Sequence, residues 1–358
     1  MSRIYNFSAG PAVLPLEVLE EAQRDLVDYQ GCGMSIMEMS HRGKAFDAVH
    51  QEAQANLREL LGLPEDFEVL LLQGGASMQF ATLPMNFLGQ GQTADYVNSG
   101  AWGSAAIKQA RLVGNVNVCA DCEKDIPTRV PAQSELKQTP GAAYFHYTTN
   151  ETISGAQWKT LPKTDAPLVA DMSSDILSRP MDFAPFSLAY AGAQKNLGPS
   201  GVTVVLVRKS FAERSNKAIP AIFRYPTHIE NQSLYNTPPC FGVYMLTLVT
   251  RWVKRMGPAR LFKQNADKAA LLYQAIDASG FYRGTAAEDC RSDMNVTFRL
   301  PTAELEAEFC SAAKKAGLDG LKGHRSVGGI RASIYNAFPV EGVRALAHFM
   351  GEFERAHG

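Results

Sequence analysis

Residues 187–207 are SLAYAGAQKNLGPSGVTVVLV, two apolar runs joined by a polar segment that contains one lysine. The runs at 187–191 and 202–207 are short and apolar or β-branched, which predicts two buried strands. Gly-Pro-Ser-Gly at 198–201 is a turn signal. Lys195 is therefore expected between the end of a strand and a turn.

Short apolar runs alternate with longer helical periodicities through the rest of the chain, which predicts an α/β fold with a mainly parallel sheet. Helices are expected from Leu16, with Leu19, Ala22 and Leu26 on one face, and over 44–61, where Gly62 and Pro64 follow. Further buried strands are expected at 67–72, 94–97, 116–120, 142–147 and 167–170.

Nearly every polar cluster lies just past the end of a predicted strand. Gly74-Gly75-Ala76-Ser77 follows the strand at 67–72, Trp102 follows 94–97, and Asp171 follows 167–170. Ligands of open α/β sheets bind at this carboxyl edge of the strands. We therefore expect these clusters and Lys195 to form one site.

A domain boundary is expected near Gly257-Pro258. Residues 16–258 would form the large domain, and residues 259–358, with 1–15, a smaller α+β domain. The smaller unit is expected to contain a helix over 259–279, strands at 295–300 and 329–335, a helix with Leu305, Phe309, Ala312 and Ala316 on one face, and a closing helix with Val343, Leu346, Phe349 and Phe353.

Composition excludes several classes of protein. The 358 residues carry 35 Lys and Arg against 36 Asp and Glu, a net charge of −1, which argues against binding nucleic acid through bulk charge. No apolar run is long enough to span a membrane, and no signal-peptide core is seen. Six cysteines in a chain of this length do not form a disulfide framework, so a cytoplasmic protein is expected. Cys119 and Cys122 form a C-x-x-C pair, which we interpret as structural.

Lys195 and Asp171 are the candidate catalytic residues. A lysine that is partly desolvated at a sheet edge can have a lowered pKa and form a Schiff base, although most single lysines are solvated loop residues. Asp171 ends an apolar strand 24 positions earlier and can hold a protonated pyridine nitrogen. The alternative for Asp171 is a helix N-cap.

Two further clusters suit an aromatic phosphate. Backbone N–H groups of Gly74-Gly75-Ala76-Ser77 can cradle a phosphate, although a plain turn is as consistent with the sequence. The indole of Trp102, between glycines, can stack on an aromatic ligand or be an ordinary core residue. The P-loop and dinucleotide fingerprints are absent.

Two His-Arg pairs, His41-Arg42 and His324-Arg325, together with Arg331, indicate an anionic substrate, because arginine binds carboxylate and phosphate with two hydrogen bonds. Surface charge is the alternative for either pair alone. No metal site is expected, because no set of His, Cys, Asp and Glu has ligand spacing.

Taken together, these motifs resemble the class V aminotransferases, enzymes with the type I fold for pyridoxal 5′-phosphate, and the resemblance covers essentially the whole chain. It rests on several stretches in order: Asn6-Phe7-Ser8-Ala9-Gly10-Pro11-Ala12, Ser40-His41-Arg42-Gly43-Lys44, Asn150-Glu151-Thr152-Ile153, Ala193-Gln194-Lys195-Asn196, Asn236-Thr237-Pro238-Pro239, Lys322-Gly323-His324-Arg325 and Arg331-Ala332-Ser333-Ile334-Tyr335-Asn336-Ala337. It implies a large domain with a mainly parallel seven-stranded sheet flanked by helices.

The resemblance implies a role for each motif. Lys195 would carry the cofactor, Asp171 would pair with its ring nitrogen, and Trp102 would stack on the ring. Thr152 would bond the phenolic oxygen. The cofactor phosphate would be bound by Ala76, Ser77, Ser173 and Gln194, and by Asn236 and Thr237 of a neighbouring subunit, which implies a homodimer. The substrate would be bound by His41, Arg42, His324, Arg325 and Arg331.

The implied reaction moves an amino group between glutamate and 3-phosphohydroxypyruvate, giving O-phosphoserine and 2-oxoglutarate in serine biosynthesis. Some bacterial relatives also act on a phosphorylated threonine precursor in pyridoxine synthesis. Ser77 and Ala9 stand where some relatives have arginine and serine. Three alternatives stay open. The first is an alanine–glyoxylate or serine aminotransferase, and the second is a non-catalytic protein that binds the cofactor. The third is a cysteine desulfurase, although Cys290 and Cys310 have no recognisable context for the thiol that such an enzyme needs.

Overall fold

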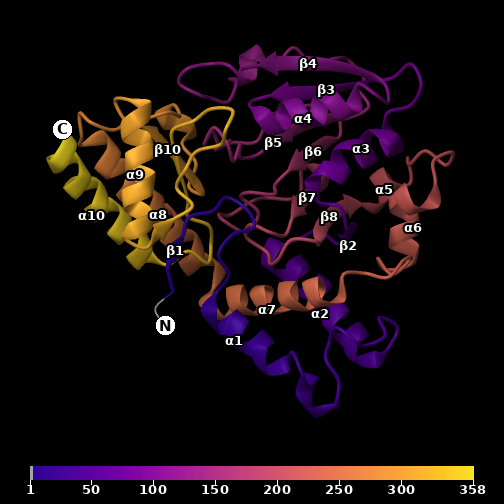
Figure 1. Cartoon of the computed structure of the whole chain (residues 1–358). Helices are drawn as coiled ribbons and strands as arrows, with labels where there is room; N and C mark the ends of the chain where they lie inside the picture. The colour runs from indigo at the N-terminus through magenta and orange to yellow at the C-terminus, as the bar shows by residue number, and fades with distance from the viewer. Residues whose placement is uncertain (1–2) are drawn as a thin grey trace.

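The computed structural model describes residues 3–358, and its centre is a seven-stranded sheet (Figure 1). Only β8 runs antiparallel to its neighbours in this sheet, so the prediction of a mainly parallel α/β sheet is confirmed. The strands, in spatial order, are β2 (Phe67–Leu72), β8 (Thr203–Arg208), β7 (Phe186–Gly192), β6 (Leu168–Asp171), β5 (Phe145–Thr148), β3 (Thr93–Asn98) and β4 (Asn115–Asp121).

Helices cover both faces of the sheet (Figure 1). Because both faces are buried, most of the strands carry apolar residues on both sides and can be recognised in the sequence as continuous apolar runs. One face is covered by α1 (Leu16–Asp25), α2 (Lys44–Leu61) and α7 (Cys240–Met256), and the other by α3 (Gly75–Phe87) and α4 (Ala101–Ala110).

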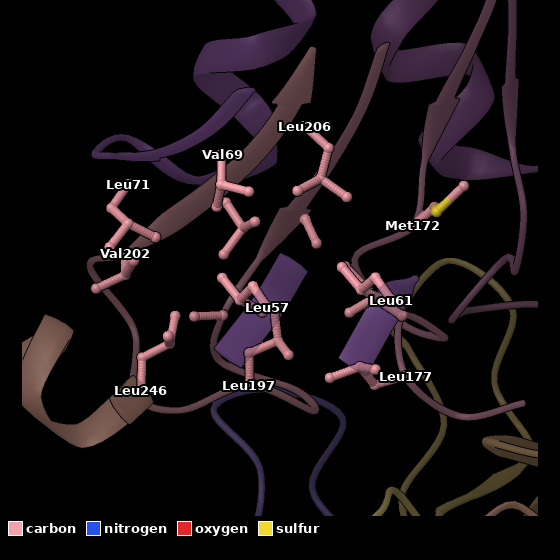
Figure 2. Packing of buried hydrophobic residues seen from close by; sticks show 14 of the residues in the cluster. Leu57, Leu61, Val69, Leu71, Met172, Leu177, Leu197, Val202, Leu206 and Leu246 are labelled. Carbon is pink, nitrogen blue, oxygen red and sulfur yellow. The ribbon is translucent and has the colours of Figure 1, made fainter. Parts of the chain in front are cut away.

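Figure 2 shows the packing on the face covered by α2 and α7. Leu57 of α2 and Leu246 of α7 belong to one cluster with Val69 of β2 and Leu206 of β8, and none of these four side chains is more than 3% exposed. Burying one such side chain stabilises the fold by ~1.5–3 kcal/mol. The cluster therefore holds the sheet rigidly, and with it the strand ends that carry the polar loops.

Two helices of this layer differ from expectation. No helix was expected at α7, because its residues 242–250 are all buried, and periodicity alone does not distinguish such a continuous run from a buried strand. In α1 the expected apolar face is wrong in part: Leu16 and Leu26 are 51% and 42% exposed, while Val18 and Ala22 are buried. The helix is rotated so that two leucines remain outside the core.

The C-terminal part of the chain has its own hydrophobic core, to which Phe7 also belongs. Its helices are α8 (Pro258–Asp277), α9 (Ala303–Lys315) and α10 (Val340–His357), and its antiparallel sheet has the order β12 (Ile330–Ser333), β10 (Asn295–Arg299) and β9 (Arg283–Gly284). The strand β1 (Tyr5–Asn6) pairs in parallel with β11 (Leu318–Asp319). Met1 and Ser2, which the sequence assigns to this unit, lie outside the described residues.

Smaller differences concern short elements. Ala316 is exposed, against expectation, because α9 ends at Lys315. Strands of two residues, β1, β9 and β11, were not predicted. The remaining short helices are η1 (Tyr29–Gly31), η2 (Gln133–Glu135), α5 (Lys209–Ala212), η3 (Ala221–Phe223), α6 (Tyr225–Glu230) and η4 (Glu288–Cys290). No helix within residues 3–358 is long and apolar enough to cross a membrane.

Cys119 and Cys122 are free thiols inside the protein, as their structural interpretation requires. Their sulfurs donate to the carbonyl oxygens of Tyr96 and Arg129 at 3.2 and 3.3 Å. Burial raises the pKa of each thiol to about 12, which suppresses the reactive thiolate.

Candidate active site

A cavity of about 370 Å³ opens at the carboxyl edge of the seven-stranded sheet. Its walls come from the loops after β2, β3, β5, β6 and β7, so the expectation that the polar clusters meet at this edge is confirmed. The lining includes Gly74, Gly75, Ala76, Ser77, Trp102, Thr148, Asn150, Thr152, Asp171, Ser173, Gln194 and Lys195.

Lys195 lies in the loop after β7, and its amine points to the opposite wall of the cavity. The amine donates a hydrogen bond to Thr152 Oγ1 at 2.6 Å and lies 5.7 Å from the centre of the Trp102 ring. Loss of water around the amine lowers the pKa of Lys195 to about 8, although the negative charge of Asp171 opposes this shift. A lysine in this state has far more neutral amine at neutral pH than a solvated one.

Asp171 is the last residue of β6 and is 4% exposed. Its Oδ1 accepts the backbone N–H of Ser173 at 2.9 Å, and the Ser173 hydroxyl accepts the N–H of Gly192 at 3.0 Å. Burial raises the pKa of Asp171, while the Ser173 hydrogen bonds and the charge of Lys195 act in the opposite direction. A cationic partner in the cavity would therefore stabilise the ionised carboxylate.

The helix α3 begins at this cavity. Gly74 precedes it with φ of 86°, and no side chain caps its first turn. A Cβ on Gly74 would lie 2.6 Å from Met78 Cβ, so glycine is required by both its conformation and its surroundings. The N–H groups of Ala76 and Ser77 in the first turn have no acceptor inside the helix and can bind an anion.

Three lining residues keep a buried polar atom without a partner in the described part of the chain: Trp102 Nε1, Thr148 Oγ1 and Asn150 Oδ1. Buried polar groups are nearly always hydrogen-bonded, so unpaired atoms around a cavity indicate a ligand with polar atoms. A carbonyl compound with an aromatic ring and a phosphate matches this set: an amine, a buried carboxylate, an indole and a helix N-terminus. The residues therefore fit pyridoxal 5′-phosphate.

The predicted substrate residues do not line this cavity. Arg331, in β12, has its Nη1 3.5 Å from the carbonyl oxygen of Thr152, which is a lining residue. His41 and Arg42 lie in the loop before α2, and His324 and Arg325 in the loop after Leu321, where His324 Nδ1 is 2.7 Å from Ser326 Oγ. Both arginines of the two pairs are exposed.

Asn236 and Thr237 also lie outside the cavity. Within the same chain, Asn236 Nδ2 donates to Gln73 Oε1 at 3.0 Å, and Gln73 Nε2 approaches the Thr237 carbonyl oxygen at 3.4 Å. Gln73 immediately precedes Gly74 at the start of the proposed phosphate cradle. The pair is therefore close to the edge of the site but does not reach into it.

The sequence analysis assigned no role to Thr148, Asn150 and Glu151, of which Thr148 and Asn150 line the cavity. Glu151 is fully buried, and burial raises its pKa to about 7 against the opposing effect of two backbone N–H groups. All three follow or end β5, so their position after an apolar run is the signal that could have found them. No cluster of His, Cys, Asp or Glu suited to a metal ion occurs in the part of the chain that the structure describes.

Comparison with known proteins places this site in a family. A phosphoserine aminotransferase of Niallia circulans is 57% identical, with 99% of each chain covered. Two solved structures of phosphoserine aminotransferases superpose on this chain. The one from Bacillus circulans subsp. alkalophilus has a TM-score of 0.97, and the one from Trichomonas vaginalis, described as bound to PLP, has a TM-score of 0.94. Their identities are 56% and 39%, and the alignments cover 99% and 98% of this chain and 99% and 100% of theirs. The aminotransferase class-V profile matches residues 4–346, and the chain therefore belongs to that family.

Proposed function

We propose that this chain is a pyridoxal-phosphate-dependent phosphoserine aminotransferase, which exchanges the amino group between glutamate and 3-phosphohydroxypyruvate. The observation that carries the proposal is the Lys195 amine, with a lowered pKa, in one cavity with buried Asp171 and the ring of Trp102. The full-length likeness to phosphoserine aminotransferases, at 57% identity to one of them, supports the choice of substrate.

The residues of the cavity would each hold one part of the cofactor. The N–H groups of Ala76 and Ser77, with Ser173 and Gln194, would bind its phosphate. Asp171 would bind the ring nitrogen, Thr152 the phenolic oxygen, and Trp102 the ring face. When bound, pyridoxal phosphate supplies a carbonyl carbon that bonds an amine and a protonated ring that accepts electrons from the substrate's α-carbon.

The chain's own groups then move the proton. With an amino acid joined to the cofactor in its place, the neutral Lys195 amine would take the proton from the substrate's α-carbon and deliver it to the carbonyl-derived carbon of the cofactor. Thr152 Oγ1, 2.6 Å from that amine, would orient it, and Arg331, with its Nη1 3.5 Å from the Thr152 carbonyl oxygen, would hold the α-carboxylate of the substrate. An ionised Asp171 would keep the ring nitrogen of the cofactor protonated.

Cofactor capture by the cofactor-free protein is expected to reach half its maximal rate near pH 8, because only the neutral amine attacks a carbonyl. A pKa of about 8 in place of 10.5 gives roughly 300-fold more neutral amine at pH 7 than an ordinary lysine has. Since the pKa is lowered, the rate rises as the pH passes through 8 and then levels off. Stopped-flow absorbance from pH 6.5 to 10.5 measures it, and a rate still rising steeply at pH 10 contradicts the assignment.

We further propose that the active enzyme is a cytoplasmic homodimer. Leu26, Val27, Met34 and Met37 are between 42% and 82% exposed and cluster around α1 and η1, where a second subunit would cover them. Asn236 and Thr237 would then reach the phosphate of the partner's cofactor, and His41 and Arg42 the partner's substrate. The absence of disulfides among the six free cysteines is consistent with a reducing compartment.

The domain division 16–258 and 259–358, with the N-terminal residues, is likewise proposed. The helix α8 starts at Pro258, at the proposed boundary, and Phe7 packs into the core that α8, α9 and α10 build. This arrangement would let the C-terminal unit carry Arg331 and the loop of His324 and Arg325 against the cavity.

Substrate choice is tested by replacing His324 and Arg325 with alanine. Charged hydrogen bonds of this kind contribute about 1.5–3 kcal/mol each. We therefore expect kcat/KM for O-phosphoserine to fall by ~10²-fold or more in the double variant, while that for unphosphorylated serine changes little. Arg344→Ala, an exposed arginine of α10, is the control.

The outcomes separate the candidates. A loss confined to the phosphorylated substrate supports a phosphate site, which would also accept the phosphorylated threonine precursor of pyridoxine synthesis. Unchanged kcat/KM for O-phosphoserine contradicts the proposal and favours an aminotransferase of the alanine– or serine–glyoxylate type. If the wild-type protein binds the cofactor but its absorbance does not change to that of the cofactor's amine form when glutamate is added, the protein is a non-catalytic binder.

A further inference from the structure

The helix α4, which carries Trp102, begins without a cap of its own. Its first flanking residue is Gly100, which has no side chain to accept the free N–H groups of the first turn. A side chain 49 positions away does so: Glu151 Oε2 accepts the Trp102 N–H at 3.1 Å, and Glu151 Oε1 accepts the Gly103 N–H at 3.0 Å. The buried carboxylate also faces the positive end of the helix.

Both glycines beside Trp102 make room for this carboxylate. A Cβ on Gly100 would lie 2.6 Å from Glu151 Cδ and 2.7 Å from its Oε2. A Cβ on Gly103 would lie 3.0 Å from the carbonyl oxygen of Val97 and 3.4 Å from Glu151 Oε1. At Gly100 the φ of 167° is ordinary extended backbone, so the obstacle to a larger residue there is the carboxylate itself.

Glu151 is fixed on its own side as well. Its N–H donates to the carbonyl oxygen of Ala156 at 2.8 Å, and its carbonyl oxygen accepts the N–H of Gly155 at 2.8 Å. The next residue is Thr152, whose hydroxyl accepts the hydrogen bond of the Lys195 amine. One side chain therefore joins the backbone that carries the indole to the loop that orients the amine.

We propose that Glu151 is a positioning residue: its carboxylate fixes the Trp102 backbone relative to Thr152, and so holds the indole and the Lys195 amine at a set separation across the cavity. Glu151 lies outside the cavity lining, so it would act on a bound ring through the Trp102 backbone and Thr152. The inference rests on the proposed function, because a set separation matters only if a ring is held between the indole and the amine.

The test compares Glu151→Gln with wild type. Glutamine keeps one acceptor oxygen and loses the charge, and its amide donor faces the N–H of Trp102 or Gly103. We expect the dissociation constant for pyridoxal phosphate to rise about 10–100-fold and the circular dichroism of the bound cofactor band to weaken. Glu135→Gln is the matched control, because Glu135 also accepts a backbone N–H, that of Ala132 at 2.7 Å, but its carboxylate bonds Arg129 and Ala132, neither of which lines the cavity.

A double-mutant cycle with Gly100→Ala separates positioning from general damage. The methyl group of Gly100→Ala should displace the carboxylate and reproduce the weakened affinity and dichroism. In a Glu151→Ala background the same methyl group meets no carboxylate, so adding Gly100→Ala should change the affinity by less than about threefold. Thermal unfolding of the cofactor-free proteins shows whether each variant folds.

The outcomes are distinct. Weakened affinity and dichroism in Glu151→Gln, together with non-additivity in the cycle, support the inference. Wild-type affinity and dichroism in Glu151→Gln overturn it, as do additive effects of Gly100→Ala and Glu151→Ala. A wild-type protein that does not bind pyridoxal phosphate refutes the proposed function instead.

Discussion

Replacement of Lys195 with alanine is expected to reduce transamination by at least ~10⁴-fold, because the variant loses both the covalent attachment point and the proton carrier. In the structure no other amine takes this place: the cavity has a single lysine among its lining residues. The guanidinium of Arg331, beside Thr152, remains cationic and cannot serve as a base.

The measurement is an absorbance scan of the purified protein before and after borohydride. Wild type should show a visible cofactor band that borohydride fixes covalently, and peptide mapping should find the label on Lys195. Lys268 is an internal control, because it is also fully buried but donates to the carbonyl oxygens of Tyr335 and Phe338 at 2.7 and 3.1 Å. Label on Lys268, or covalent fixation in Lys195→Ala, would contradict the assignment.

The sequence predicted those parts of the fold that depend on local signals. The helix α2 has the predicted ends, because Gly62 adopts the left-handed conformation that stops it. The helix α7 could not be predicted in this way, since its residues 242–250 form one continuous buried run, which periodicity does not distinguish from a buried strand. The strands β1 and β11 pair across more than 300 residues, and two-residue strands carry no periodicity.

The same distinction applies to the site. Lys195 and Trp102 follow strands and Asp171 ends one, so the sheet itself brings them to one edge. Glu151 acts through a contact with a helix 49 positions earlier, and no local pattern signals a contact of that kind. Arg42 and Arg325 are exposed in the single chain, so their proposed roles depend on a second subunit or on movement of a loop.

Asp171→Ala is expected to lower kcat by about 10²–10³-fold, corresponding to about 3–4 kcal/mol for removing one partner of a buried charge pair. The carboxylate is nearly inaccessible to water, and its hydrogen bonds from Ser173 leave lone pairs free to bind a ring N–H in the cavity. Without it the bound ring would lose its proton and accept electrons poorly.

The pair interaction predicts a specific rescue. A cofactor analogue methylated at the ring nitrogen is permanently positive and no longer needs a carboxylate to hold its charge, so it should restore part of the rate of Asp171→Ala. Asp175→Asn is the matched control: Asp175 is also buried but bonds Gln157 at 3.2 Å and lies outside the cavity lining. Because its loss leaves the ring's partner in place, the analogue should bring no gain there. An equal gain in both variants, or none in either, would mean that Asp171 supports the fold and does not control the charge of the ring.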